Sequence, residues 1–218
     1  MSAIEFSPNA VSLDGWLSAG EVLTYASATT FTVAGDRTAK YQKGTRLKLT
    51  QTTTKYFVCV GVSFAAGVTT VTVTGGSDYS LANAVISDPY YSYAVSPQGY
   101  PDWFAYTPTF TGFSSSPTAG YARFKVVGRM CFYGIHYNDG TSNATTFAVT
   151  LPINSGVTGG AYQVVGPVKN NGTQASTPGL VGDLTAGSTT LNVYRDLVGA
   201  AWTNSGAKNA QIEGWYEI

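Results

Sequence analysis

The sequence has little charge, cysteine, histidine or methionine. Its 218 residues include 12 basic and 12 acidic side chains, so charged residues make up 11% of the chain and the formal net charge is zero. An average globular domain is about 25% charged. Two cysteines, Cys59 and Cys131, are too few for a disulfide scaffold and read as buried free thiols. The single histidine, His136, excludes a metal site built from several histidines.

The shortage of charge excludes whole classes of protein. A nucleic-acid-binding surface needs clustered lysine and arginine, and this chain, with a sequence pI near 6.5, has no such cluster. Disordered chains combine low hydrophobicity with high net charge, whereas 44% of these residues are hydrophobic and the charges cancel. Long helical bundles rely on glutamate and lysine pairs, which are scarce here. We therefore expect a folded protein that does not bind nucleic acid.

Long apolar runs are absent too. The most apolar stretch, residues 57–68 (FVCVGVSFAAGV), spans 12 residues, and a membrane-spanning helix needs about 20. Residues 1–10 contain no lysine or arginine and no continuous apolar segment, so they do not read as a secretion signal. We expect a protein that is made in a cytoplasm and is not inserted into a membrane.

Aromatic residues and short alternating segments are abundant. The chain has 15 tyrosines, 10 phenylalanines and four tryptophans. Polar and apolar residues alternate in residues 45–50 (TRLKLT), 69–74 (TTVTVT) and 189–194 (TTLNVY), which is typical of strands with one buried face. Turn signals separate such segments at Ala65-Ala66-Gly67, Asp139-Gly140 and Asn170-Asn171-Gly172, and Gly128 marks either a turn or a β-bulge. Residues 89–93 read as an edge strand.

These patterns predict an all-β protein made of two small antiparallel domains, each a β-sandwich or barrel. Residues 96–108 (SPQGYPDWFAYTP) hold three prolines and four aromatics, which disfavours a strand and favours a stiff linker. The predicted organisation is a first domain over residues 1–95, a linker over 96–108 and a second domain over 109–218.

The sequence offers little material for catalysis. Hydrolysis by general acid and base needs two positioned carboxylates, and the closest pair, Glu213 and Glu217, would lie about 13 Å apart along a strand. That separation exceeds both glycosidase geometries. His136 is the only candidate base for a catalytic triad, and we interpret it as a partly exposed strand residue. We expect a protein that is not an enzyme and that uses no metal and no cofactor.

Aromatic side chains are the one positive chemical signal. Tyrosine and tryptophan stack on sugar rings and anchor protein interfaces, although most of them fill β cores. Trp103 and Trp202 fall in loop-like contexts. The predicted receptor-binding or interface residues are Trp103, Tyr106, Tyr137 and Trp202.

Two parts of the chain resemble modules of bacteriophage tail-fibre, head-fibre and related virion proteins. Residues 31–76 contain FTVAGDRT, then GTRLKL, then TTVTVTGG, and they follow Asp14-Gly15-Trp16 and residues 25–30 (YASATT). The second half is similar to fibre-tip β-sandwich domains in residues 103–110 (WFAYTPTF), 147–152 (FAVTLP), 202–206 (WTNSG) and 214–217 (GWYE).

This resemblance implies a virion component, commonly a homotrimer, that is made in the host cytoplasm without a signal peptide. One module would attach to other virion proteins of the capsid or tail, and the other would face outward and bind a host-surface glycan or protein. Because the chain has no coiled-coil or β-helical shaft, a short fibre, spike or tip fits its length. Two alternatives stay open: a capsid or tail decoration protein with no receptor, and a small polysaccharide depolymerase or esterase.

Overall fold

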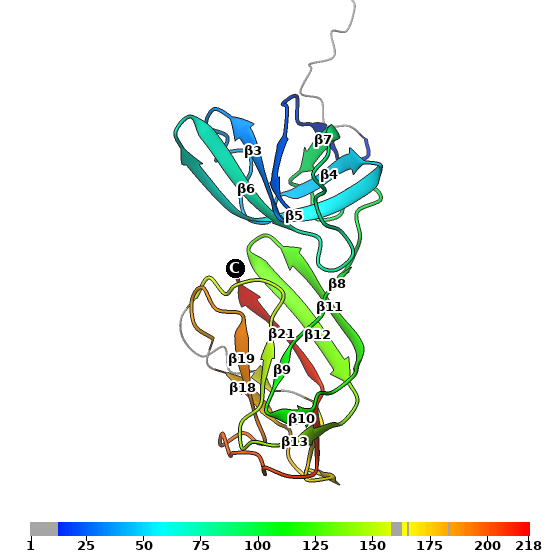
Figure 1. Ribbon diagram of the computed structural model, residues 1–218, viewed down its shortest axis with the longest axis vertical. Coiled ribbons are helices and arrows are strands. Elements are labelled where there is room, and N and C mark those ends of the chain that lie inside the picture. The colour runs from blue at the N-terminus through cyan, green and yellow to red at the C-terminus, as the bar shows by residue number, and fades with distance from the viewer. Residues whose placement is uncertain (1–12, 158–162, 165, 183) are drawn as a thin grey trace, which may run out of the picture. The chain divides into compact units, whose positions relative to one another are not determined.

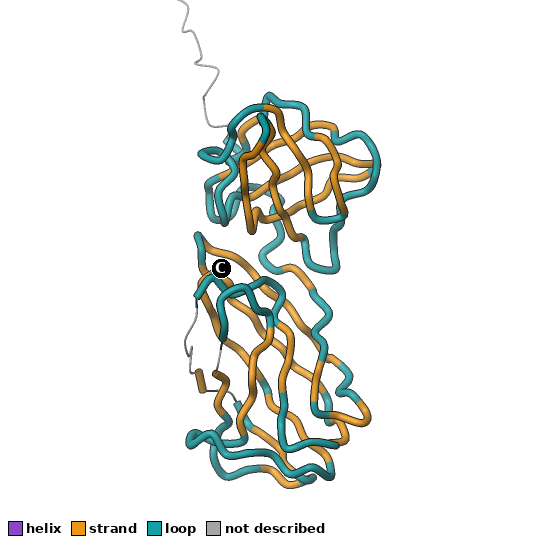
Figure 2. Tube along the Cα trace, turned by 60° about the vertical axis from the view of Figure 1, so that its left-hand side comes forward, coloured by secondary structure: helices purple, strands orange, loops and turns teal. Residues whose placement is uncertain are grey.

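A computed structural model describes residues 13–157, 163–164, 166–182 and 184–218. These residues form antiparallel strands joined by turns, with no helix among them, which confirms the all-β prediction (Figures 1 and 2). The described part of the chain separates into two compact units. The first runs to Gly75 and resumes at Tyr79–Asp102, and the second comprises Gly76–Asp78 and Trp103–Ile218. Residues 1–10, with their expected lack of a secretion signal, lie outside the described residues.

The first unit is built on one antiparallel sheet of seven strands in the order β1-β7-β4-β5-β6-β3-β2. The β5–β6 hairpin turns at Ala66 and Gly67, whose φ angles are 51° and 79°. Positive φ at both central residues matches the twist of a two-residue hairpin, so the turn predicted there is confirmed. The strands are β1 (Leu17–Ser18), β2 (Thr24–Ser27), β3 (Thr30–Ala34), β4 (Arg46–Gln51), β5 (Thr53–Ala65), β6 (Val68–Thr74) and β7 (Ser87–Ser92).

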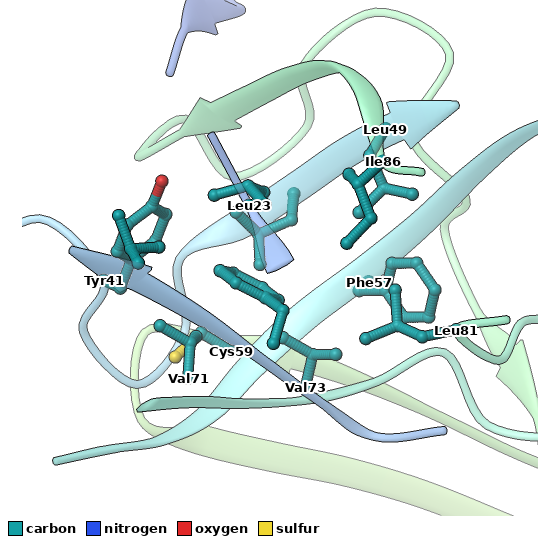
Figure 3. Close-up of a cluster of buried hydrophobic side chains, with 12 residues drawn as sticks. Leu23, Tyr41, Leu49, Phe57, Cys59, Val71, Val73, Leu81 and Ile86 are labelled. Atoms are coloured by element: carbon teal, nitrogen blue, oxygen red, sulfur yellow. The ribbon is translucent and has the colours of Figure 1, made fainter. Parts of the chain in front are cut away.

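Alternation along the strands sets the core of the first unit. Leu47 and Leu49 on β4 point to the same side as Phe57 on β5 and Val71 and Val73 on β6, and each is at most 2% exposed. Phe31 and Tyr41 meet edge to face inside this cluster, with ring centroids 5.7 Å apart. Figure 3 shows these apolar side chains gathered over one face of the sheet. Their burial is the main favourable contribution to the stability of this unit.

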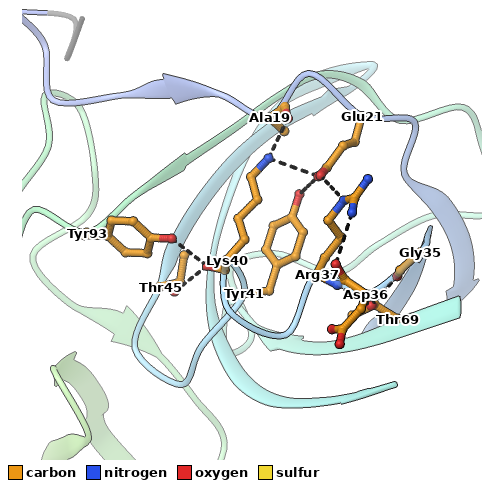
Figure 4. A network of polar contacts seen from close by, with 10 residues as sticks. All are labelled: Ala19, Glu21, Gly35, Asp36, Arg37, Lys40, Tyr41, Thr45, Thr69 and Tyr93. Atoms are coloured by element: carbon orange, nitrogen blue, oxygen red, sulfur yellow. Dashed lines mark hydrogen bonds and ion pairs between the residues drawn. The ribbon is translucent and has the colours of Figure 1, made fainter. Parts of the chain in front are cut away.

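A polar network closes one end of this core (Figure 4). The Glu21 carboxylate lies 2.5 Å from Arg37 Nε and 3.1 Å from Lys40 Nζ, and it accepts a hydrogen bond of 2.8 Å from the Tyr41 hydroxyl. Burial tends to raise the pKa of Glu21, but the contacts with Tyr41, Lys40 and Arg37 outweigh it and hold that pKa below its ordinary value. The same contact with Glu21, together with burial, raises the pKa of Tyr41 well above its usual range.

The second unit contains three short antiparallel sheets, ordered β21-β12-β11-β8, β15-β18-β19-β14-β9 and β10-β13-β20-β16-β17. Gly128, with a φ of 60°, turns β11 into β12. The strands are β8 (Phe104–Ala105), β9 (Phe110–Thr111), β10 (Phe113–Ser115), β11 (Ala119–Val127), β12 (Met130–Tyr137), β13 (Gly140–Ser142), β14 (Ala148–Thr150), β15 (Gln163–Val164), β16 (Val168–Asn170), β17 (Thr173–Gln174), β18 (Leu180–Gly182), β19 (Thr190–Tyr194), β20 (Ala207–Ala210) and β21 (Ile212–Glu217).

The inward side chains of these sheets share one core. Phe124, Ile135 and Tyr216 come from the four-stranded sheet, and Val149 and Leu191 come from β14 and β19; all are at most 2% exposed. The Tyr216 hydroxyl donates to the Ile153 carbonyl oxygen at 2.7 Å and so ties the four-stranded sheet to the segment after β14. Layers of sheet around one apolar core are the arrangement expected of a β-sandwich.

The second unit is assembled from two stretches of chain. Gly76–Asp78 belongs to it although its neighbours in sequence belong to the first unit. The Ser77 N–H donates to the Ala105 carbonyl oxygen, and the Asp78 carboxylate accepts from the Ala105 N–H, both at 2.8 Å. These bonds extend the edge of β8.

Several predicted boundaries differ from the structure. Residues 96–102 of the predicted linker belong to the first unit and 103–108 to the second. Within that stretch Phe104–Ala105, which lie between Pro101 and Pro108, form β8 and pair with β11. The predicted edge strand is β7, which lies between β4 and the two residues of β1.

The hairpin predicted at Asp139-Gly140 does not form. β12 pairs with β11 and β21, whereas β13 pairs with β10 and β20. Gly140 is not among the residues with positive φ. A side chain there would come within 2.7 Å of Pro117 Cδ, so glycine serves close packing at this position and not a turn.

Candidate functional site

Two of the four predicted contact residues lie in the core of the second unit. Tyr137 is 4% exposed and Trp202 is 3% exposed. The Tyr137 hydroxyl accepts a hydrogen bond from the Ala210 N–H at 2.9 Å, and the Trp202 indole N–H donates to the Val193 carbonyl oxygen at 2.7 Å. Both polar ends are satisfied inside the unit. Both rings are therefore almost fully buried in the folded unit, and Trp202 lines the smaller pocket described below.

The other two predicted residues are half-buried and lie apart in the sequence from the cleft described below. Trp103 lies beneath two cations, with Arg123 Cζ at 4.6 Å and Lys125 Nζ at 4.8 Å from its ring centroid. Tyr106 packs edge to face on Phe124, and burial raises the pKa of its hydroxyl well above the usual range. The four residues therefore do not form a common site.

The candidate site is a polar cleft of about 410 Å³ in the second unit. Its two walls are the β16–β17 hairpin with the residues that follow it, and the first residues of the loop after β19. Clefts of this size are common ligand sites, and loops that border a rigid scaffold often carry binding residues. The lining residues, which we call the polar cleft, are Asn170, Thr173, Gln174, Ala175, Ser176, Thr177, Arg195 and Asp196.

The hairpin wall is fixed by its turn. Asn171 and Gly172 have φ angles of 51° and 78°, which confirms the turn predicted at this position. The Asn170 side-chain oxygen accepts from the Thr203 N–H at 3.1 Å and from the Thr203 hydroxyl at 3.0 Å. Gly206, with a φ of 72°, passes so close that any Cβ there would collide with Asn171. The hairpin is thus held against residues 203–206.

The opposite wall is organised by one carboxylate. Asp196 Oδ1 accepts from the Val198 N–H at 3.2 Å and from the Ala200 N–H at 3.0 Å. The Arg195 N–H donates to the Ala200 carbonyl oxygen at 3.2 Å. These bonds close residues 195–201 into a compact turn, which we call the Asp196 loop. Aspartate suits this position because its short side chain bonds the backbone two residues further on.

The cleft presents both hydrogen-bond donors and acceptors. The hydroxyls of Thr173, Ser176 and Thr177 form no hydrogen bond with any residue that the structure describes. Arg195 keeps a side-chain exposure of 37%, and its Nη2 lies 3.6 Å from Asp196 Oδ2. An arginine fork beside hydroxyl and carboxylate groups matches a ligand that is itself rich in hydroxyl or carboxylate groups.

The Asp196 loop also borders a smaller pocket of about 270 Å³ whose walls include Phe147, Tyr194 and Trp202. Behind two of these rings lies Lys208, which is fully buried. Its Nζ donates to the Thr146 carbonyl oxygen at 2.9 Å and to the Ala144 carbonyl oxygen at 3.1 Å, and it lies 5.8 Å from the ring centroids of both Phe147 and Trp202. Burial lowers the pKa of this amine to about 8.

Other chemical groups are dispersed over the described residues. Glu217 pairs with Arg129 at 3.3 Å and Glu213 accepts from the Tyr121 hydroxyl at 3.1 Å, both on β21. His136 is exposed on β12 and stacks on Tyr121. The described part of the chain holds no group of three histidine, cysteine, aspartate or glutamate side chains placed to bind a metal ion. It also has no helix with the length and apolar character to cross a membrane.

Comparison of the chain with protein-family models, with curated protein sequences and with solved structures finds no match.

Sequence reasoning missed the residues of the cleft except for the turn beside it. The Asn170-Asn171-Gly172 signal located one wall correctly, but nothing in the sequence linked it to Arg195 and Asp196, which lie in the loop after a strand of a different sheet. A cluster of threonine and serine after a predicted hairpin, at residues 173–177, is the signal that could have marked the cleft.

Proposed function

We propose that this chain is a non-enzymatic bacteriophage virion protein, a short fibre, spike or tip, whose second unit binds a host-surface glycan in the polar cleft. The first unit attaches the protein to other virion proteins. The chain is made in the host cytoplasm and self-associates, with a homotrimer as the expected state. The observation that carries the binding role is the polar cleft, which brings together Arg195, the exposed hydroxyls of Thr173, Ser176 and Thr177, and the Asp196 loop.

A glycan suits the cleft for chemical reasons. Sugar hydroxyls both donate and accept, so they can pair with the free hydroxyls of Thr173, Ser176 and Thr177 and with the amide of Gln174. Arg195 adds a planar fork for a sugar hydroxyl or a sugar acid.

The binding role is tested by applying the full-length protein to bacterial cells and to immobilised cell-wall and capsular polysaccharides. We expect retention on the host's surface glycan, and we expect Arg195→Ala to weaken it about tenfold or more, since a lost hydrogen bond to a charged group is worth about 1.5–3 kcal/mol. Ser176→Trp, which fills the cleft from an exposed position, should weaken binding without unfolding the unit. The matched control is Arg129→Ala, which removes the same side chain outside the cleft.

Equal binding by Arg195→Ala, Ser176→Trp and the unchanged protein would contradict the cleft as the binding site. Release of soluble sugar from the polysaccharide by the pure protein would favour the depolymerase or esterase alternative.

A second candidate function is decoration of a capsid or tail without a receptor. It is favoured by the tip of the Asp196 loop, where Leu197 is 52% and Val198 is 90% exposed, because adjacent exposed apolar side chains suit a protein partner. Incorporation into particles without any retention on cells or glycans would support this function.

A further inference from the structure

The outer face of the β21-β12-β11-β8 sheet is not used by the polar cleft. Strand register places Arg123, Gly134 and Glu213 in one row across the sheet, and Lys125, Phe132 and Trp215 in the next outward row. Trp215 is 54% and Tyr121 is 37% exposed, so large aromatic side chains project from this face. Aromatic and arginine side chains are the types enriched at the centres of protein interfaces.

The charged side chains of strands β11 and β21 on the outer face are separated by sign, and Arg129, in the turn before β12, pairs with Glu217 at 3.3 Å. Arg123 and Lys125 project from β11, which we call the basic stripe, and Glu213 and Glu217 project from β21, which we call the acidic stripe. Strand β12 lies between them and contributes Phe132 and no acid. Two strand spacings, about 10 Å, therefore separate the stripes.

These side chains are held in place before any partner arrives. Arg123 Cζ lies 4.6 Å from the Trp103 ring centroid and 4.8 Å from that of Tyr121. The Tyr121 hydroxyl in turn donates to Glu213 Oε1 at 3.1 Å. An ordered surface loses less side-chain entropy when it binds, which favours association.

We propose that this outer face is the surface through which two copies of the chain associate, with the basic stripe of one copy against the acidic stripe of the other. A partner of one sign would place like charges opposite one of the two stripes, which costs affinity. A surface that carries the same two stripes in reversed order meets both with opposite charge, and a second copy of this face is such a surface. The contact is self-complementary in the manner required of a two-fold pair, and a ring of three copies would need a different, head-to-tail contact.

This inference rests on the self-association in the proposed function, names the surface responsible and replaces the expected homotrimer with a two-fold pair. The test is sedimentation velocity or mass photometry of the full chain, from nanomolar to tens of micromolar. Unchanged protein should associate. The double variants Arg123→Glu/Lys125→Glu and Glu213→Lys/Glu217→Lys should each shift the midpoint of association about a hundredfold or more to higher concentration, because like charges then face each other.

Two further samples make the test specific. The fourfold variant that exchanges both stripes restores complementarity and should associate again. An equimolar mixture of the two double variants should form pairs, since one face is then wholly acidic and the other wholly basic. Acidic and basic copies cannot alternate around a ring of three, so the mixture also distinguishes a two-fold pair from a trimer. Lys43→Glu/Lys55→Glu, in the first unit, is the control, because it changes the net charge by the same amount as Arg123→Glu/Lys125→Glu.

Each result has one meaning. Loss of association in both double variants with recovery in the fourfold variant supports the proposal. Association that survives both double reversals overturns this surface while the proposed self-association stands. A monomeric unchanged protein at tens of micromolar overturns both, and glycan binding by the cleft is then judged separately from the Arg195→Ala experiment. Trp215→Asp, at an exposed position, should also weaken association, and no change in that variant counts against the surface.

Discussion

Glu21 in the first unit and Lys208 in the second show two opposite ways of burying a charge. In the first unit, the half-buried Glu21 is surrounded by Arg37, Lys40 and the Tyr41 hydroxyl, so the carboxylate is compensated on several sides. In the second unit, Lys208 is fully buried, and its bonds go to two neutral carbonyl oxygens and to aromatic faces, with no carboxylate of the described residues beside it. A compensated charge stabilises the fold when it is ionised, whereas an uncompensated one stabilises it more when it is neutral.

The units also differ in the sequence separation between the strands that pair. The first is a single sheet in which β2 and β3, β4 and β5, and β5 and β6 are sequence neighbours. In the second, β12 pairs with β21 near the end of the chain, and three sheets share one core. The polar cleft of the second unit is made from the β16–β17 hairpin with the residues after it and from the loop that follows β19. Under the proposed function, the regular first unit serves attachment and the irregular second unit serves recognition.

The largest expected effect separates the two cores. Phe31→Ala in the first unit and Phe124→Ala in the second each remove a fully buried ring and should each cost about 3–5 kcal/mol. Differential scanning calorimetry should resolve two transitions, with each substitution lowering one of them. A single transition that both substitutions lower equally would mean that the two units unfold together. The stability of each unit could then not be compared with that of the other.

The next effect concerns Lys208. Its folded pKa of about 8 lies below the ordinary value of 10.5, so the unfolded chain binds more protons between these values and stability rises with pH there. From about pH 7 to about pH 9.5 the gain should be about 2 kcal/mol. At higher pH the buried tyrosines oppose it, because the pKa values of Tyr137 and Tyr216 are raised by burial and their ionisation favours the unfolded chain.

Urea unfolding of the second unit across this range provides the measurement. Lys208→Met keeps most of the apolar stem but cannot ionise, and it should abolish the rise. Lys169→Met, a partly exposed lysine paired with Asp139, is the matched control and should keep it. A rise of equal size in the Lys208→Met protein would contradict the assignment.

The smallest effect is expected at Glu21. Its pKa is held below 4.5, so its contribution is complete above that pH and is lost as the pH falls through the folded value. Glu21→Gln should cost about 1–3 kcal/mol at neutral pH, because Arg37 and Lys40 lose their counterion and the Tyr41 hydroxyl keeps only a neutral acceptor. Tyr41→Phe, which removes only one bond, should cost less. Acid titration followed by tryptophan fluorescence should show a smaller loss of stability in Glu21→Gln than in the unchanged protein, and equal losses would refute the role of this carboxylate.

The part of the fold that sequence predicts well is local. Ala66-Gly67, Gly128 and Asn171-Gly172 form turns because the backbone at these positions requires positive φ, a property that the residue types themselves carry. The alternation of polar and apolar residues in β4 and β6 likewise shows directly which side chains are buried. The hairpin predicted at Asp139-Gly140 was wrong because Gly140 is required by close packing. Phe113 and Pro117, which tertiary packing brings next to it, leave no room for a side chain there.

The candidate site was harder to predict for the same physical reason. A tryptophan in a loop-like sequence gives no sign of whether the chain folds over it, and Trp202 is covered by Phe147 and bonded to Val193. Arg195 and Asp196 belong to no sequence motif. They are candidate binding residues only because the fold places them across the cleft from residues 173–177. Binding residues that come from separate sheets become neighbours only after folding.

The discontinuous make-up of the second unit has a practical consequence for dissecting this protein. A fragment that starts at Trp103 lacks Gly76–Asp78, so the backbone of Ala105 loses both of its partners and β8 is left with a bare edge. Such an edge invites pairing with other chains. A fragment that is intended to show the second unit alone should therefore carry Ser77 and Asp78 through a short engineered connection to Trp103, and it should be soluble where the simple truncation aggregates.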